Sequence, residues 1–154
     1  MGIGPSTKET TLHHFRDPLL DVISSDSDIN LIGIIVVGTP QSNEDKYFVG
    51  RRAALCARSM NADGVIISVD GFGNSHVDYA NTIEEIGKLK IPVVGMSFIG
   101  NQGRFVITNK YMDTIVDLNK SSDGTETQRV GENTACHIDA RKAVALLKLK
   151  IRRM

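Results

Sequence analysis

The sequence predicts an α/β fold, a three-layer sandwich with a mainly parallel central sheet, flavodoxin-like or related to it. Short apolar runs rich in Val and Ile alternate along the chain with amphipathic segments of helical period. Glycines and polar residues follow several of these runs, as expected where parallel strands end. The 154 residues are 41% hydrophobic and 23% charged, which suits one core. We therefore expect a single α/β domain over 1–154.

The first elements are a short helix and a strand. Phe15 to Ile23 can form the helix, with Asp17 as its N-cap and Pro18 at its first position. The apolar run 31–37 is the first expected strand. Residues 1–13 precede both as an N-terminal segment.

The segment 44–61 is expected to be an amphipathic helix that crosses over to the second strand. Its apolar residues recur at helical spacing, at Val49, Ala53, Cys56 and Met60. This pattern places Cys56 in the core, where a free cysteine behaves as a small hydrophobic side chain rather than a redox group.

The run 64–69 gives the strongest strand signal, because it is bounded by Gly and rich in Val and Ile. A helix over 76–89 ends before Pro92, and proline suits the first position of a strand over 91–97 because it donates no ladder hydrogen bond. A weaker strand pattern covers 114–118. Residues 120–132 carry almost nothing apolar and predict a flexible loop before a last helix from about Cys136.

Charge and cysteine usage argue against several classes of protein. Lysine plus arginine and aspartate plus glutamate both number 18, so we expect no nucleic-acid partner. Cys56 and Cys136 show neither metal nor disulfide spacing, and the adjacent His13 and His14 carry no metal signature. No apolar run approaches the roughly 20 residues of a membrane span. We expect a cytoplasmic protein without a metal, whose basic tail 148–153 is a solvated element end or a partner surface.

Three polar loops are candidates for a functional site: 38–43, 70–76 and 98–104. The carboxyl ends of parallel strands meet at one edge of a sheet, so these loops would form a polar rim there. Their Gly, Asn, Gln and Ser residues are also what ordinary turns use, and both interpretations stay open. The glycines match neither a dinucleotide fingerprint nor a phosphate loop, so no nucleotide is indicated.

Within the rim, Asp70, His76 and Asp78 could form an acid/base group. A carboxylate in the first turn of the following helix is the commoner reason for an aspartate at such a position. The spacing therefore leaves the group as one of two interpretations.

Residues 14–18, the strand end at Gly38 and Thr39, and above all 63–74 with Asp78 resemble a known family. They are similar to the C-terminal, pyruvoyl-bearing portion of the proprotein subunits of D-proline reductase and of glycine, sarcosine and betaine reductase. The resemblance runs from about residue 11 to the C-terminal region. The chain length is similar to that of a small stand-alone paralogue of the processed subunit encoded in D-proline reductase operons.

The resemblance implies a carbonyl chemistry. In this family an internal cysteine undergoes self-cleavage and becomes a pyruvoyl group that captures the substrate amine, and a partner selenocysteine protein takes part in cleaving the C–N bond. That cysteine would fall upstream of His14, around residues 2–7, where this chain has none. Ser6 is the hydroxyl substitute for a processing site. We expect no cofactor in this chain and no activity of the chain alone.

Two functions follow from the resemblance. The chain is an accessory or structural component of a D-proline (amino-acid) reductase system, or a catalytic subunit in reductive C–N cleavage of D-proline or a glycine derivative. Both imply anaerobic amino-acid fermentation, other reductase subunits including a selenoprotein, and a homo- or hetero-oligomer. No catalytic residue is assigned. The candidates for substrate or partner binding are His14, Asp70, Gly71, Phe72, Gly73, Asn74, Asp78 and Asn101.

Overall fold

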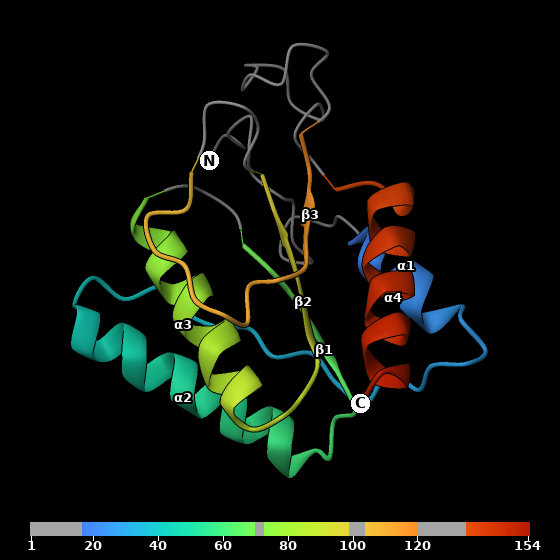
Figure 1. The fold of residues 1–154 in the computed structure, drawn as a ribbon, viewed down its shortest axis with the longest axis horizontal. Coiled ribbons are helices and arrows are strands. Elements are labelled where there is room, and N and C mark those ends of the chain that lie inside the picture. The colour runs from blue at the N-terminus through green and yellow to red at the C-terminus, as the bar shows by residue number, and fades with distance from the viewer. Residues whose placement is uncertain (1–16, 70–72, 99–103, 120–134) are drawn as a thin grey trace.

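Three parallel strands form a sheet at the centre of the computed structural model, which describes residues 17–69, 73–98, 104–119 and 135–154 (Figure 1). The strands are β1 (Val65–Ser68), β2 (Val93–Ser97) and β3 (Ile115–Asp117), in the order β1-β2-β3. Both neighbouring pairs are parallel. The predicted α/β class and parallel sheet are confirmed.

Helices cover both faces of this sheet (Figure 1). On one face α3 (Asn74–Lys88) packs on the strands, with α2 (Asn43–Ser59) beside it. On the other face α4 (His137–Arg152) packs on all three strands, with α1 (Pro18–Ser24) beside it. The predicted three-layer sandwich is therefore confirmed.

The central strand β2 divides the hydrophobic core into two halves. All five of its residues are buried, as expected for a parallel strand covered on both faces. Val94 and Met96 belong to the core on the α4 side, whereas Val93 belongs to the core on the α3 side. This alternation follows from the two-residue period of a strand.

The helix boundaries follow local signals in the sequence. Asp17 caps α1 as predicted, because its Oδ1 accepts a hydrogen bond from the Leu19 backbone N–H at 2.9 Å. Pro18 occupies the first turn, where its missing N–H costs nothing. Ser42 caps α2 in the same way, accepting from the Asp45 N–H at 3.1 Å.

The predicted strand over 31–37 is wrong for this structure. These residues are assigned to no strand, and most of them are exposed. The apolar composition that suggested a buried strand is present, but no backbone hydrogen bond joins 31–37 to β1. β1 is consequently an edge strand within the described part of the sheet.

The predicted core face of α2 is wrong except at Ala53, which is buried. Cys56 and Met60 are exposed rather than buried. The helix packs against α3 instead of against the sheet, and close approach of two helices favours small side chains. A Cβ on Gly50 would lie 2.2 Å from Asn81 Nδ2, which shows how close the two helices are. The buried residues of α2 are Lys46, Gly50, Ala53, Ala54 and Ala57.

Two lysines of the basic tail hold other segments against α4. Lys148 Nζ donates to Asp26 Oδ1 at 2.7 Å and to Asp28 Oδ2 at 3.0 Å. The hydrogen bond from Lys148 holds the pKa of Asp26 below its usual range. Lys150 Nζ donates to the Val93 carbonyl at 2.9 Å. These lysines therefore fix the segment after α1 and the start of β2.

The remaining predictions of chain organisation concern residues 1–13 and 120–132, which lie outside the described residues. Among the helices that the structure describes, none has the length and apolar character that crossing a membrane would need.

Candidate functional site

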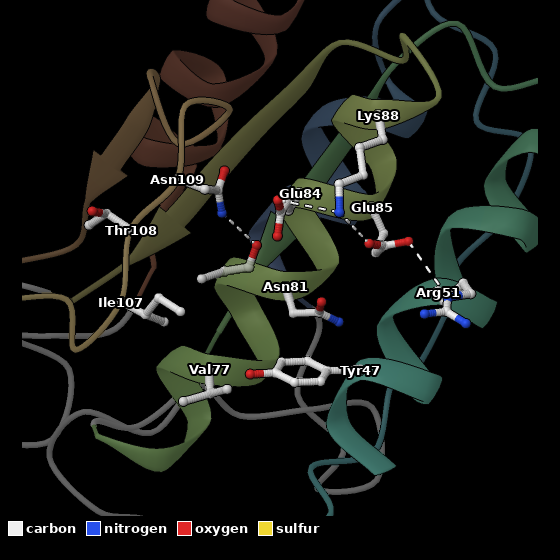
Figure 2. Close-up of a pocket in the computed structure, with 11 residues that line it drawn as sticks. Tyr47, Arg51, Val77, Asn81, Glu84, Glu85, Lys88, Ile107, Thr108 and Asn109 are labelled. Carbon is white, nitrogen blue, oxygen red and sulfur yellow. Dashed lines mark hydrogen bonds and ion pairs between the residues drawn. The ribbon is translucent and has the colours of Figure 1, made fainter. Parts of the chain in front are cut away.

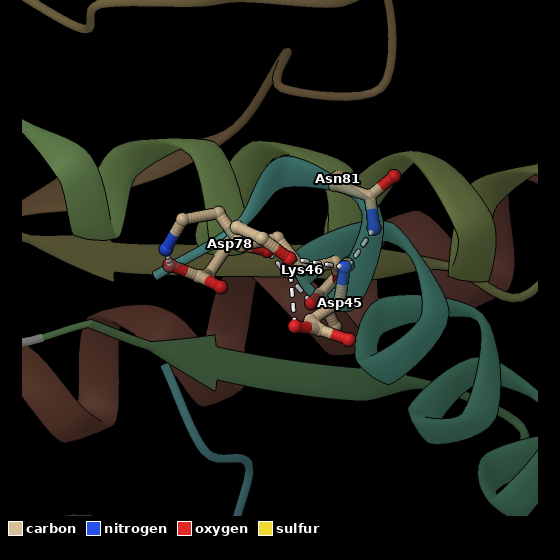
Figure 3. A network of polar contacts seen from close by, with 6 residues as sticks. Asp45, Lys46, Asp78 and Asn81 are labelled. Atoms are coloured by element: carbon tan, nitrogen blue, oxygen red, sulfur yellow. Dashed lines mark hydrogen bonds and ion pairs between the residues drawn. The ribbon is translucent and has the colours of Figure 1, made fainter. Parts of the chain in front are cut away.

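An ion pair lies buried between the N-terminal halves of α2 and α3 (Figure 3). Lys46 Nζ donates to Asp78 Oδ2 at 2.5 Å. The Lys46 side chain is 0% exposed and the Asp78 side chain 7% exposed. Because α3 follows the carboxyl end of β1 and the pair joins the N-terminal halves of α2 and α3, the pair lies toward that end of the sheet (Figure 1).

The surroundings of this ion pair leave part of its hydrogen-bonding capacity unused. Asp78 Oδ1 is buried, and no group in the described residues donates to it. The Asp78 carbonyl accepts from Thr82 Oγ1 at 2.7 Å, which fixes the backbone next to the carboxylate. Removing two charges from water is costly, so such a pair is weak evidence of stability by itself. The ion pair does provide a fixed dipole at the edge of the sheet, and Asp78 Oδ1 can accept a further hydrogen bond.

His76 lies deep in the same region. It is buried, and its ring lies 4.9 Å from the Phe105 ring, centroid to centroid, in a tilted arrangement. Burial lowers the pKa of His76 below its ordinary value of 6.5, so the imidazole is neutral at pH 7. Residues two apart on a helix point in different directions, and Asp78 pairs with Lys46. Asp70, the third member of the predicted acid/base group, lies outside the described residues.

The lowered pKa of His76 has a consequence for stability. Below pH 6.5 the unfolded chain gains a proton on this residue that the folded chain does not yet bind, so the free energy of unfolding should fall as the pH falls. We expect a steeper loss of stability between pH 7 and pH 5 in the wild type than in His76→Gln. Urea denaturation at several pH values measures this. Equal slopes for the two proteins would contradict it.

Tyr79 fills the space between α3 and the sheet. It is buried, and its ring stacks on Phe105 with centroids 5.8 Å apart. Its Oη lies against Gly95 of β2, where a Cβ would be only 2.0 Å away. The hydroxyl has no hydrogen-bond partner among the described residues, and burial raises its pKa. The Tyr79 hydroxyl is therefore protonated at neutral pH.

The predicted binding candidates are only partly described. Gly73 precedes α3 with φ 64° and ψ −105°, a conformation that glycine adopts without strain. No atom lies within 4 Å of a Cβ built there, so the constraint on Gly73 is conformational rather than steric. Asn74 begins α3 and is exposed, whereas Asp78 is buried against Lys46. The candidates that lie outside the described residues are Ser6, His14, Asp70, Gly71, Phe72 and Asn101.

A polar groove of about 370 Å³ runs along the outer side of α3, between α2 and residues 107–109 (Figure 2). Charges of both signs line it. Lys88 Nζ lies 2.8 Å from Glu85 Oε1 and 3.3 Å from Glu84 Oε1, while Arg51 Nε lies 3.9 Å from Glu85 Oε2. Asn109 and Asn81 add side-chain amides to the lining.

Asn81 links this groove to the buried ion pair. Its Nδ2 donates to the Lys46 carbonyl at 3.4 Å (Figure 3). Asn109 Nδ2 donates to the Ala80 carbonyl at 2.8 Å and so fixes the opposite wall (Figure 2). The groove has the size and the mixed charge for a small polar molecule or a surface loop of another protein.

Sequence reasoning missed Lys46, Tyr79 and the groove. One signal was available for Lys46. It lies on the same face of α2 as the small residues that follow it at helical spacing, which are Gly50, Ala53, Ala54 and Ala57. A stripe of Gly and Ala on a helix indicates close packing against a neighbour, and a lysine on that stripe must find a buried partner. Tyr79 gives no comparable signal, because its position over Gly95 depends on tertiary packing.

Comparison with known proteins shows the family to which this chain belongs. The family model of glycine/sarcosine/betaine reductase component B subunits matches residues 2–124. The chain belongs to this family. Its sequence is 44% identical over 149 residues to the D-proline reductase proprotein PrdA of Acetoanaerobium sticklandii, a match that covers 97% of this chain and 24% of the proprotein. The resemblance noted from the sequence is therefore confirmed.

A second member of the reductase family is more distant. The sarcosine reductase complex component B subunit alpha of Peptoclostridium acidaminophilum is 24% identical over 106 residues, which is 66% of this chain and 25% of that subunit. The chain thus spans about a quarter of the length of these curated relatives. No solved structure matches it.

Proposed function

We propose that this chain is an accessory component of a D-proline reductase system, acting in the cytoplasm through contacts with the catalytic subunits. The observation that carries the proposal is the 44% identity to a D-proline reductase proprotein over nearly the whole chain. Family membership supports a role in an amino-acid reductase system generally. The partners would include the selenoprotein of that system.

The accessory role is supported by the positions of the two cysteines. The pyruvoyl group of the family arises from a cysteine by cleavage of the backbone, and residues 2–7 contain none. Cys56 lies inside α2, where cleavage would cut the helix that holds Lys46. The Cys136 backbone N–H donates to Asp139 Oδ2 at 3.0 Å at the start of α4. A pyruvoyl group does not fit either position, so we derive no step through one.

The groove and the first turn of α3 are the surface proposed to contact the other subunits. Arg51 is 66% exposed at the groove and Asn74 is exposed nearby in α3. Both can be replaced without disturbing buried groups. A polar surface with charges of both signs suits recognition of a protein partner, because complementary charges set orientation and association rate.

Binding of this chain to D-proline reductase subunits tests the proposal. We expect a stable complex in size-exclusion chromatography. Arg51→Ala should weaken it about tenfold because a charge contact with the partner is lost, and Asn74→Ala should weaken it by a similar or smaller factor because its exposed amide no longer hydrogen-bonds the partner. Arg141→Ala, an exposed position on α4 at the opposite face, is the matched control and should bind as the wild type does. No binding to any reductase subunit would overturn the proposal.

A catalytic role is the alternative, and the observation that favours it is the buried Lys46–Asp78 pair, with a second buried titratable residue, His76, on the same helix. Buried ionisable groups at the edge of a parallel sheet are typical of active sites as well as of structural networks. In that case D-proline or a glycine derivative would be reduced only when this chain is present, and Lys46→Met would abolish turnover. Full activity of the other subunits without this chain would exclude this alternative.

A further inference from the structure

The outer face of α2 carries exposed apolar side chains together with arginines. The helix packs on α3 through the face that holds its small residues and Lys46, and the opposite face is turned away from α3 (Figure 1). On that opposite face Phe48 is 54% exposed and Leu55 is 52% exposed. Arg52 and Arg58 are exposed on the same side. We call these four residues, Phe48, Arg52, Leu55 and Arg58, the α2 ridge.

The spacing of the α2 ridge is that of a helix surface on which another helix can pack. Phe48, Arg52 and Leu55 are separated by four and then three residues, so their side chains lie in one row along α2. A single exposed apolar side chain needs no explanation, but Phe48 and Leu55 stand about two turns apart in the same row. Two large apolar side chains at this separation match the period at which a facing helix presents its own apolar residues.

The charge of α2 indicates the chemistry of the partner. Residues 47–59 contain three arginines and no acidic residue. In the described parts of the chain no carboxylate forms an ion pair with Arg52 or Arg58, whereas Arg51 reaches Glu85 at the groove. Arg58 lies in the last turn, where a cation stabilises a helix through its dipole, but Arg52 lies in the middle of α2, where that effect is small. The α2 ridge therefore complements a partner that brings carboxylates.

The side chain of Arg52 is held in a position to bind such a carboxylate. Its guanidinium carbon lies over the Phe48 ring, 5.5 Å from the ring centroid. This contact uses the attraction between the cation and the ring face and leaves the guanidinium N–H donors available. A carboxylate can accept two of these hydrogen bonds at once, and less side-chain freedom is lost on binding because Arg52 already rests on Phe48.

We propose that the α2 ridge binds an acidic amphipathic helix of another subunit. The carboxylates of that helix pair with Arg52 and Arg58, and its apolar side chains cover Phe48 and Leu55. An apolar centre with a charged rim is the common arrangement of protein interfaces. A nucleic acid fits less well, because a phosphate backbone would leave Leu55 uncovered and the chain has zero net charge. The inference rests on the proposed function, since it states the chemistry of the partner that an accessory component requires.

Binding of the full chain to purified D-proline reductase subunits, measured by biolayer interferometry, tests the inference. Arg52→Glu sets a carboxylate against those of the partner and should weaken binding about 100-fold. Leu55→Ala removes apolar contact and should weaken binding about tenfold. Lys142→Glu and Leu149→Ala are the matched controls, because both residues are exposed on α4 at the other face of the sheet, and both variants should bind as the wild type does. Circular dichroism checks that each variant folds.

A photo-crosslinking amino acid in place of Leu55 identifies the bound segment. We expect the cross-linked peptide of the partner subunit to carry aspartate or glutamate on both sides of apolar residues at helical spacing. Cross-links to a neutral or basic segment, or to a second copy of this chain, would overturn the proposal. So would a labelled RNA oligonucleotide that binds the wild type tightly and Arg52→Glu weakly, because it would assign the α2 ridge to nucleic acid.

The variants also separate this inference from the proposed function. If Arg51→Ala weakens the complex while Arg52→Glu and Leu55→Ala leave it unchanged, the acidic helix is wrong and the accessory role stands. Equal weakening by Arg52→Glu and Lys142→Glu would likewise overturn the inference alone, since the effect would not depend on the α2 ridge. If no reductase subunit binds the chain, the proposed function and the inference both fail.

Discussion

Gly95→Ala is expected to destabilise the fold by about 3 kcal/mol, which is a large effect for one methyl group. The new Cβ would lie 2.0 Å from Tyr79 Oη and 3.0 Å from Tyr79 Cζ. Gly95 is in the middle of the buried strand β2, and Tyr79 is itself buried, so neither side can yield easily. Urea denaturation followed by circular dichroism measures the loss.

Two further variants isolate the cause. Gly38→Ala changes a glycine that has no atom within 4 Å of its Cβ position, and its stability should stay within about 0.5 kcal/mol of the wild type. In a Tyr79→Phe background the hydroxyl is gone, so Gly95→Ala should cost clearly less than it does alone. A Gly95→Ala protein as stable as Gly38→Ala would show that the contact with Tyr79 does not exist.

Lys46→Met should cost about 3–5 kcal/mol of folding stability, because it leaves the buried Asp78 carboxylate without its counter-ion. Methionine has a similar length, so lost packing is a minor part of the effect. Asp78→Asn should also be destabilising. The double variant Lys46→Met/Asp78→Asn should lose less than the sum of the two single variants, since neither charge is then left alone.

Lys88→Met provides the comparison at the protein surface. Lys88 pairs with Glu84 and Glu85, but its side chain is half exposed, and pairs of this kind are worth about 0–1 kcal/mol. Chemical denaturation of all four variants under one set of conditions gives the coupling directly. If Lys46→Met lost no more stability than Lys88→Met, the Lys46–Asp78 pair would not be buried as described.

The sequence was sufficient to predict much of the fold because the signals were local. The strands β1, β2 and β3 lie within the predicted runs 64–69, 91–97 and 114–118. The cap of α1 at Asp17 was likewise predicted from two adjacent residues. Each of these features depends on composition or spacing within a few residues, which one sequence can show.

The errors arose where packing between distant segments decides the outcome. The run 31–37 has the composition of a strand, but a strand also requires a partner, and the described sheet ends at β1. On α2 the larger apolar residues suggested the core face, while the buried face consists of small residues and Lys46, because α3 packs against it. Hydrophobicity alone did not distinguish packing on a sheet from packing on a helix.

The predicted site residues stay predictions, and the sequence analysis lacked one partner of the buried ion pair. Asp78 was among the candidates, while its partner Lys46 lies 32 residues earlier in the chain. A pairing over that separation has no local signature. The predictions for Asp70, Phe72 and Asn101 concern residues outside the described ranges and stay predictions.

The intact mass of the native protein, recorded before and after borohydride treatment, decides between the accessory and the catalytic role. If the chain has an accessory role, it carries no reducible carbonyl, borohydride leaves its mass unchanged, and amino-acid reduction depends on the partner subunits. A chain cleaved near Ser6, whose larger fragment gains mass by hydride addition, would contradict the accessory role and make this chain a catalytic subunit.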